Sequence, residues 1–157
     1  SCILSFRDEI PNLIKTEDTE YLKNNSYTFE ELLIKKSKKI KFRSINKKVL
    51  IHGHCHQKAF DVLRSVQEVL GELGGLKVEP IETSCCGMAG AFGYGADTYD
   101  VSMKMANASL LPAIRTAPPD TLIAADGTSC RSQIKDGTGR EAVHVAVLLD
   151  RLMSKQR

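Results

Sequence analysis

Lys48-Val49-Leu50-Ile51-His52 is a short run of β-branched and aliphatic residues in the first half of this chain. Its length and composition predict a buried strand. Two further strands are predicted over residues 77–81 and 121–125. Pro80 cannot donate a backbone hydrogen bond, so it places the second strand at a sheet edge or near a strand end. These three runs determine the fold class.

Helical patterns separate the predicted strands. They occupy residues 57–72, 97–115 and 139–153, and a further one runs from the capping pattern at Thr28 towards Lys39. Strands that alternate with helices pair in parallel, because the helices serve as crossover connections. The sequence therefore predicts an α/β fold in which helices flank a short parallel sheet.

Cysteines follow each predicted strand. Cys55 comes after the first strand, Cys85 and Cys86 come after the second, and Cys130 comes after the third. Sites in such sheets form outside the carboxyl ends of the strands. We therefore expect cysteine-bearing loops at one edge of the sheet, with all four thiols in a shared site.

The cysteine pattern indicates metal chemistry. Soft thiolates select zinc, copper(I) or an iron–sulfur cluster. Adjacent Cys85 and Cys86 would form a strained disulfide, and five cysteines do not make a fully paired secreted framework. We predict Cys55, Cys85, Cys86 and Cys130 as metal ligands. A thiol–disulfide enzyme that uses Cys85 and Cys86 is a weaker alternative, since no Cys-x-x-Cys is present.

A glycine-rich stretch follows the cysteine pair. Glycines permit close backbone approach and direct amide N–H groups towards an anion, so Gly87, Gly90 and Gly93 are predicted to contact the cofactor. The other interpretation is a tight turn. The stretch lacks the Gly-Lys-Ser/Thr ending of a phosphate-binding loop, which argues against nucleotide binding.

Three histidines, His52, His54 and His56, surround Cys55. We interpret them as hydrogen-bond partners of thiolates or backbone, or as a helix cap, because four thiols already complete a tetrahedral set. Zinc ligation by imidazole is the alternative. His144 lies on the last predicted helix and is expected to be a packed, buried residue.

Composition and charge limit the function classes. The 157 residues suit one domain with a real core. No apolar run approaches the roughly 20 residues of a membrane span, and no signal peptide opens the chain. We therefore expect a cytoplasmic protein without a transmembrane segment. Residues 35–48 carry eight basic and no acidic side chains. Phe42 is the single aromatic residue in this run, which lacks the repeated aromatic interleaving that stacks single-stranded bases. The run therefore indicates a solvated linker and no nucleic-acid partner.

Three segments together resemble a known module. They are His52-Gly53-His54-Cys55-His56-Gln57, Ser84-Cys85-Cys86-Gly87-Met88-Ala89-Gly90 and Asp126-Gly127-Thr128-Ser129-Cys130-Arg131. They are similar to the cysteine-rich CCG module that occurs in heterodisulfide reductase, in the iron–sulfur subunit of glycolate oxidase and in anaerobic glycerol-3-phosphate dehydrogenase. The pattern is closest to the carboxy-terminal end of fused FAD-linked oxidase/iron–sulfur proteins of the D-lactate or D-2-hydroxyglutarate dehydrogenase type.

The resemblance covers about residues 48–153 and implies a domain organisation. The family usually carries two such modules in tandem, and Ser1-Cys2 resembles the closing segment of a first one. Residues 1–47 would then be the tail of that module and a basic connector. Residues 48–157 would form the complete C-terminal module, as a fragment of a longer protein.

The resemblance also implies a function. It predicts an electron-transfer module with a [4Fe–4S] cluster inside a flavin-dependent 2-hydroxy-acid dehydrogenase or oxidase. FAD and ferredoxin-like domains would lie elsewhere in the parent protein. A quinone or another carrier would accept the electrons, and membrane association would come through partners. The fragment alone should not turn over substrate.

One departure from the resembled pattern affects the ligand count. Heterodisulfide reductase ends this pattern with Cys-x-x-Cys, whereas this chain has Cys130-Arg131-Ser132-Gln133. The fifth thiolate is absent, so four ligands remain. Four cysteines suit a [4Fe–4S] centre or a closed structural zinc site. The alternative function is therefore a zinc-binding module that docks subunits.

Overall fold

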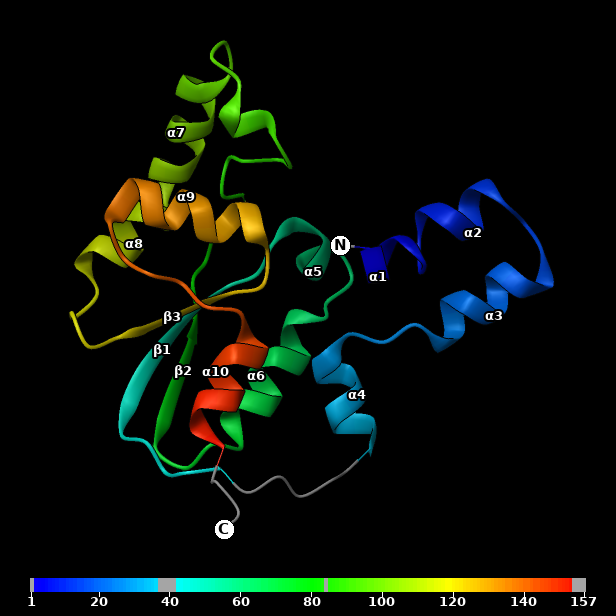
Figure 1. Ribbon diagram of the computed structural model, residues 1–157, viewed down its shortest axis with the longest axis horizontal. Coiled ribbons are helices and arrows are strands. Elements are labelled where there is room, and N and C mark those ends of the chain that lie inside the picture. Colours follow the sequence, from blue (N-terminus) through cyan, green and yellow to red (C-terminus); the bar gives the residue numbers. More distant parts are fainter. Residues whose placement is uncertain (1, 37–41, 84, 154–157) are drawn as a thin grey trace.

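The computed structural model describes residues 2–36, 42–83 and 85–153. Three parallel strands form one sheet in the order β2-β1-β3 (Figure 1). They are β1 (Lys47–His52), β2 (Leu76–Pro80) and β3 (Leu122–Ala125). Val49 in β1 pairs with Val78 on one side and Leu122 on the other. The predicted α/β class and its short parallel sheet are confirmed.

Helices cover both faces of the sheet, and β1 shows why. Its side chains alternate between faces: Val49 and Ile51 belong to the core formed with α6 (Leu63–Gly71) and α10 (Val145–Leu152). Leu50 belongs to a second core on the opposite face. That core includes residues from α7 (Tyr99–Ala108), α8 (Leu110–Thr116) and α9 (Thr128–Thr138). A strand buried on both faces is a near-continuous apolar run, as the sequence of β1 is.

Two predicted helices are each divided in the structure. The pattern over residues 57–72 forms α5 (Cys55–Ala59) and α6, and Asp61 between them has a left-handed φ of 54°. The pattern over residues 97–115 begins after the short η1 (Phe92–Tyr94) and forms α7 and α8, which meet at Ser109 with φ −155°. Apolar spacing continued across both breaks, so periodicity alone could not locate them.

The predicted start of the last helix, at residue 139, was wrong. Gly139, with φ 71°, caps the C-terminus of α9, and α10 begins only at Val145. Between them Val143 pairs in parallel with Ala124 beside β3. Helix α9 itself was missed, because only Cys130, Gln133 and Ile134 on it are buried. That narrow stripe gives a weak helical signal.

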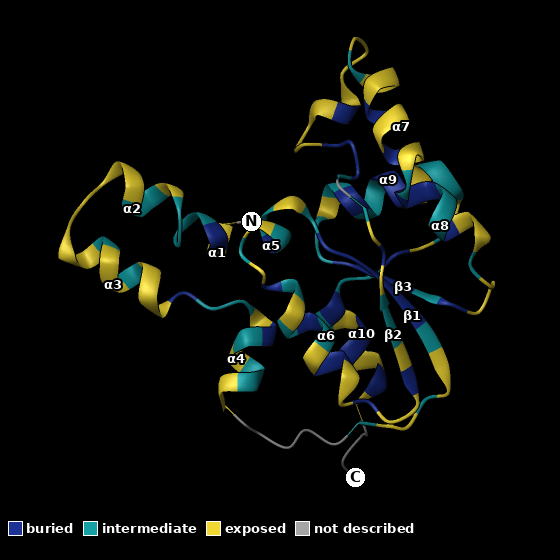
Figure 2. Cartoon of the chain, turned by 180° about the vertical axis from the view of Figure 1, so that it is seen from behind, coloured by how far each residue is buried: buried dark blue, intermediate teal, exposed yellow. Residues whose placement is uncertain are grey.

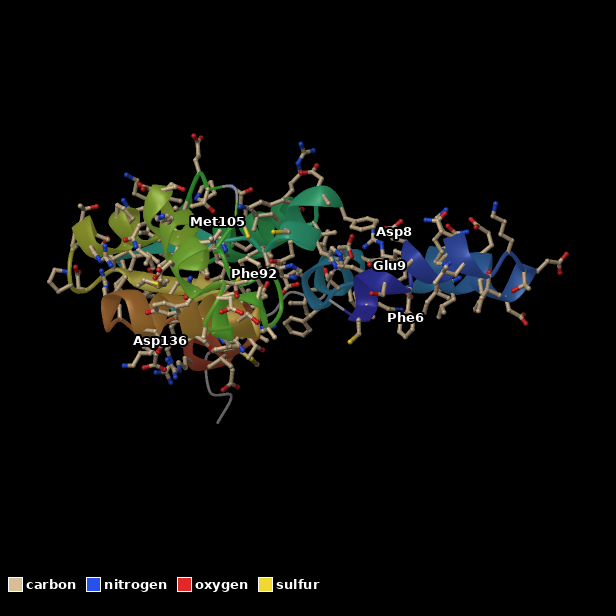
Figure 3. All side chains as sticks on the ribbon, turned by 90° about the horizontal axis from the view of Figure 1, so that it is seen from above. Phe6, Asp8, Glu9, Phe92, Met105 and Asp136 are labelled. Atoms are coloured by element: carbon tan, nitrogen blue, oxygen red, sulfur yellow. The ribbon has the colours of Figure 1, made fainter. Side chains whose placement is uncertain are left out.

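The first four helices are α1 (Cys2–Ser5), α2 (Glu9–Leu13), α3 (Glu17–Asn25) and α4 (Phe29–Lys36). Figure 2 shows that α2 and α3 extend from the sheet as a mainly exposed arm, and no residue of either is buried. Seen from above, the labelled Asp8 and Glu9 lie on this arm (Figure 3). In contrast, Leu33 and Ile34 of α4 pack against the core that contains α6.

The basic run is described only in part. Residues 37–41, which include the predicted end of the helix towards Lys39, lie outside the described residues. After them, Arg43 N–H donates to the Leu152 carbonyl and Ile45 N–H donates to the Gly74 carbonyl. Across the part of the chain that is described, every helix is too short or too polar to cross a bilayer.

Candidate metal centre

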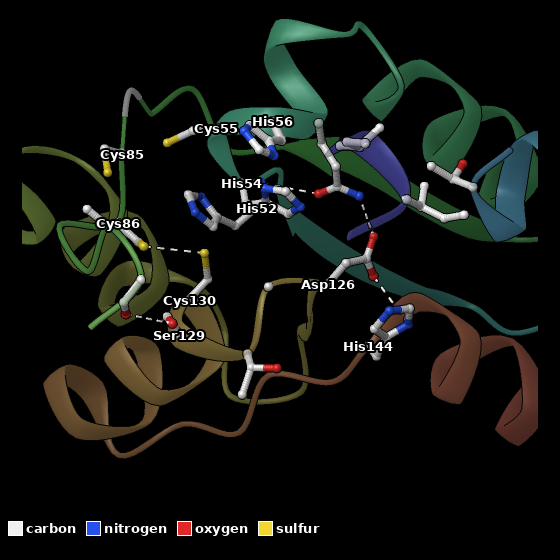
Figure 4. Close-up of a pocket in the computed structure, with 18 of the residues that line it drawn as sticks. His52, His54, Cys55, His56, Cys85, Cys86, Asp126, Ser129, Cys130 and His144 are labelled. Carbon is white, nitrogen blue, oxygen red and sulfur yellow. Dashed lines mark hydrogen bonds and ion pairs between the residues drawn. The ribbon is translucent and has the colours of Figure 1, made fainter. Parts of the chain in front are cut away.

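The four predicted cysteines line one cavity of about 520 Å³ (Figure 4). Cys55 is the first residue of α5, just after β1. Cys85 and Cys86 lie in the loop after β2, and Cys130 lies in the first turn of α9, after β3. The cysteines therefore meet beyond the carboxyl ends of the three strands, as the strand pattern predicted.

Cys86 and Cys130 form a buried thiol pair. The Cys130 thiol donates a hydrogen bond to Cys86 Sγ across 3.3 Å. This bond, followed by the nearby His52 imidazole and the Met88 backbone N–H, lowers the pKa of Cys86 below that of an ordinary thiol. The same bond and burial raise the pKa of Cys130. When the pair holds one proton, that proton is favoured on Cys130 and the negative charge on Cys86.

His52 faces this pair. It is the last residue of β1, is 1% exposed and shares a strand face with Leu50, on the side of the sheet where Cys86 and Cys130 are packed. One ring nitrogen and the two sulfurs lie within 4.8 Å of one another. The supporting role expected for His52 is therefore compatible with its position. Side-chain alternation along the strand is the sequence signal that identifies this position.

Cys55 and Cys85 lie on a more open part of the cavity wall. Cys55 is exposed and Cys85 is half-buried, and neither joins the close group of His52, Cys86 and Cys130. Gly87 N–H donates to Cys85 Sγ at 3.3 Å. Burial, and then the neighbouring Cys85, raise the pKa of Cys55. The cavity thus has one tight, buried pair of thiols, Cys86 and Cys130, and two more exposed thiols, Cys55 and Cys85.

The other two histidines near Cys55 also line the cavity, but neither belongs to the close group of His52, Cys86 and Cys130. His54 is the N-terminal cap residue of α5, and burial lowers the pKa of its imidazole. His56 Nε2 lies 3.6 Å from a carboxylate oxygen of Glu9. The rings of His54 and His56 are 6.1 Å apart and tilted by 50°. The three imidazoles therefore share one cavity without forming one close group, because the strand ends at His52 and the chain turns into a helix.

The donors at the tight pair fit a soft metal. A zinc–sulfur bond of about 2.3 Å gives sulfurs on a tetrahedral ion a separation of about 3.8 Å, close to the 3.3 Å between Cys86 and Cys130. Gly127 leaves room for one of these sulfurs, since a Cβ there would lie 2.9 Å from Cys130 Sγ. Metal binding would replace the shared proton and satisfy the buried charge.

Packing requires glycine at some positions of the loop after the cysteine pair, in addition to the predicted contact with a cofactor. Gly90 lines the cavity, and its carbonyl accepts a hydrogen bond from Ser129 Oγ at 3.0 Å. Gly87 has φ +88°, and a Cβ there would lie 2.2 Å from the Ser102 carbonyl oxygen. A Cβ on Gly93 would lie 2.3 Å from Met88 Sδ. Contact of these glycines with a cofactor stays a prediction.

Substitution of Gly87 with alanine should displace the cysteine loop. The left-handed φ and the clash with the Ser102 backbone together should cost about 2 kcal/mol or more of unfolding free energy. Gly90→Ala has a similar φ, but a Cβ there has open space, so it is the matched control and should cost less. Urea unfolding monitored by circular dichroism measures both. Equal losses in the two variants would contradict the packing argument.

A second polar group lies at the other end of the cavity. Asp126 accepts hydrogen bonds from Gln57 Nε2 at 2.5 Å and from Val145 N–H at 3.0 Å. Glu30 is only 3% exposed, and its Oε1 has no hydrogen-bond partner among the described residues. Burial, and then the charge of Asp126, raise the pKa of Glu30 to about 7. Neither carboxyl group was predicted from the sequence as a member of the site.

His144 also lines this cavity, and the expectation that it is buried was wrong. Its side chain is 38% exposed. It caps α10, where Nδ1 accepts a hydrogen bond from Ala146 N–H at 3.1 Å, and it lies 3.4 Å from Asp126 Oδ1. The helix begins one residue later than His144, so this residue is at the helix end and not on its apolar face.

Comparison with known proteins relates this chain to dehydrogenases. Over 152 residues, or 95% of the chain, it is 26% identical to one of the subunits of anaerobic glycerol-3-phosphate dehydrogenase of Escherichia coli strain K12. Over 142 residues, or 85% of the chain, it is 30% identical to D-2-hydroxyglutarate dehydrogenase of Haemophilus influenzae. This chain is similar to parts of two dehydrogenases.

The matched parts are limited. The chain spans 38% of the first relative and 14% of the second. D-2-hydroxyglutarate dehydrogenase of Escherichia coli strain K12 matches over 67 residues at 39% identity. No protein-family model matches the chain, and no solved structure matches it. The relatives agree with the oxidoreductase resemblance, whereas membership of the CCG family stays a proposal.

Proposed function

We propose that this chain is an electron-transfer module of a flavin-dependent 2-hydroxy-acid dehydrogenase or oxidase, and that it has a CCG-type site. Cys55, Cys85, Cys86 and Cys130 would hold a [4Fe–4S] cluster. The observation that carries the proposal is the convergence of four cysteines from three strand ends on one cavity. The similarity of this chain to dehydrogenases named for glycerol 3-phosphate and D-2-hydroxyglutarate supports a role in electron transfer.

The residues around the cysteines suit an anionic redox centre. A bound cluster would supply one-electron transfer. The Gly87 backbone N–H donates to Cys85 Sγ, and the Met88 backbone N–H stabilises negative charge on Cys86. Burial of Cys86 and Cys130 keeps water from that side of the centre. This chain contributes binding and electrostatics, and the substrate chemistry belongs to other domains.

The parent protein would supply the remaining parts. We propose flavin and ferredoxin-like domains as partners, a quinone or another carrier as electron acceptor, and a cytoplasmic location with membrane association through partners. The isolated chain would transfer electrons without substrate turnover. A thiol–disulfide enzyme is less well supported, because the thiol with the lowered pKa, Cys86, is buried, whereas the exposed Cys55 has a raised pKa.

A structural zinc site is the second candidate. It is favoured by one observation: Cys86 and Cys130 lie at nearly the spacing of ligands on one tetrahedral ion, with His52 beside them. In that case the module would dock subunits and carry no electrons.

Anaerobic reconstitution with iron and sulfide tests the proposal. The chain should bind iron and sulfide, absorb broadly in the visible range and bleach on reduction. Elemental analysis of a sample purified without oxygen is the companion measurement. If iron never binds, while one zinc per chain survives purification and depends on the same cysteines, the electron-transfer function is wrong and the zinc module replaces it.

The domain organisation is also a proposal: residues 1–47 as the tail of a preceding module with a connector, and residues 48–157 as the complete module. Deleting residues 1–27 should leave the fold intact. The expected loss is about 2 kcal/mol, the value for one buried leucine, because Leu4 is the buried apolar residue of α1. Chemical unfolding measures it, and Leu4→Ala in the full chain should reproduce most of it. Complete unfolding of the shortened chain would show that the boundary is wrong.

A further inference from the structure

We propose that His52 is a ligand of the metal centre and binds through Nε2, together with Cys86 and Cys130. The inference rests on the proposed function only in that the cavity holds a metal. It changes the donor set from sulfur alone to sulfur and nitrogen. The carrying observation is the close group in which one ring nitrogen of His52 and the two sulfurs lie within 4.8 Å of one another.

The ring of His52 is held in one orientation by its other nitrogen. Nδ1 lies 3.1 Å from Thr83 Oγ1, and that hydroxyl lies 3.1 Å from Lys58 Nζ. Lys58 also donates to the Thr83 carbonyl. An imidazole that binds a metal ordinarily engages its second nitrogen with such a partner, which fixes the tautomer and the ring direction. The Thr83 hydroxyl, oriented by Lys58, meets this requirement.

The remaining nitrogen lacks a partner. Nε2 of His52 is fully buried, and none of the described residues hydrogen-bonds to it. A buried polar atom without a partner costs about 1–3 kcal/mol. Since Nδ1 is engaged by Thr83 and a ring nitrogen lies within 4.8 Å of both sulfurs, a metal ion bound to the two thiols would satisfy Nε2. Neutral imidazole together with thiolates is an established donor combination for zinc and cobalt(II)-type tetrahedral sites.

Other side chains near the pair are already engaged. Gln133 donates through Nε2 to the Cys86 carbonyl at 3.1 Å and to Ser102 Oγ at 3.0 Å, so it fixes the cysteine loop. His54 is the N-terminal cap residue of α5, His56 Nε2 lies 3.6 Å from Glu9, and neither ring belongs to the close group with the two sulfurs. His52 is the histidine whose strand position aims it at both sulfurs, and His54 and His56 provide matched controls from the same segment.

The first test is cobalt(II) titration of the full, reduced chain under anaerobic conditions. The wild type should give intense thiolate-to-cobalt absorption with tetrahedral d–d bands. His52→Ala should weaken cobalt affinity by about 100-fold, because removing even a hydrogen-bonded partner of a ligand costs about 10- to 100-fold. The d–d bands of this variant should also shift. His54→Ala and His56→Ala should bind as the wild type does. Unchanged cobalt affinity in His52→Ala, or no cobalt binding by the wild type, would overturn the inference.

The second test needs no folded His52 variant. The wild-type chain, labelled with nitrogen-15 and loaded with cadmium-113, should show scalar coupling between cadmium and one imidazole Nε2. That coupling should persist in His54→Ala and His56→Ala. Cadmium binding without any imidazole coupling would restrict His52 to hydrogen bonding and overturn its role as a ligand. Failure of iron reconstitution with this coupling intact would instead refute the electron-transfer function and leave the inference standing.

Discussion

Replacing Cys86 with serine should remove the cluster from the reconstituted chain. The iron that remains bound should fall by at least about tenfold, because even residues that only support a ligand contribute 10- to 100-fold to metal affinity. Serine offers a harder and much less acidic oxygen in place of a soft sulfur. The effect should be large at this cysteine because it is buried, lies 3.3 Å from Cys130 and has a lowered pKa. Iron analysis and visible absorption after reconstitution measure it.

The fold should survive this substitution. The sheet and the two cores on its faces bury many apolar side chains besides Cys86, so circular dichroism should remain that of a folded α/β chain. Cys2→Ser is the matched control, because Cys2 is exposed and does not line the cavity. It should retain wild-type iron. Full iron content in the Cys86 variant would exclude this residue as a ligand.

Replacing Glu30 with glutamine should stabilise the fold by about 3 kcal/mol at pH 8. Glu30 is 3% exposed, and its Oε1 has no hydrogen-bond partner among the described residues. The charge of Asp126 also acts on this carboxyl group. Burial, followed by Asp126, raises the pKa of Glu30 from 4.5 to about 7. Ionising this group in the folded chain is therefore costly, and glutamine avoids that cost because it has no charge.

The sign of the pH dependence follows from the two states. The folded chain holds the proton of Glu30 more tightly than the unfolded chain, so it binds more protons between pH 4.5 and about 7. Its stability should therefore fall relative to the variant as pH rises through this window, and the difference should be constant above it. Urea unfolding at pH 4 and pH 8 checks this. Glu72→Gln, on an exposed helix end, is the control and should show no such difference. A Glu30 variant that is less stable than the wild type at pH 8 would contradict the argument.

The position of His52 shows what residue patterns along the chain cannot predict. Four thiols complete a tetrahedral ligand set, so the sequence pattern assigned His52 a supporting role. The structure buries Cys86 and Cys130 as a tight pair, leaves Cys55 and Cys85 more exposed, and places a ring nitrogen of His52 within 4.8 Å of the buried pair. Distances between side chains on different strands depend on how the strands are placed next to one another, which no local pattern records.

The helices show a similar limit. Apolar spacing located the elements around residues 57–72 and 97–115, but not the breaks at Asp61 and Ser109. Helix α9 was missed because its buried stripe is narrow and its other residues are polar. Backbone conformation at single residues is decided by packing around them, and tertiary contacts override weak local propensity.

The sequence by itself determined the three strands, their parallel arrangement and the convergence of the cysteines, because hydrophobic runs and the βαβ rule depend on local pattern and chain connectivity. Only the tertiary structure decided which sulfurs form a pair, that His52 faces them and that Glu30 is buried beside Asp126. Glu30 lies on α4, far along the chain from β3 and Asp126. Their interaction arises only when the folded chain brings α4 to the cavity, where low exposure to water strengthens the repulsion between their charges.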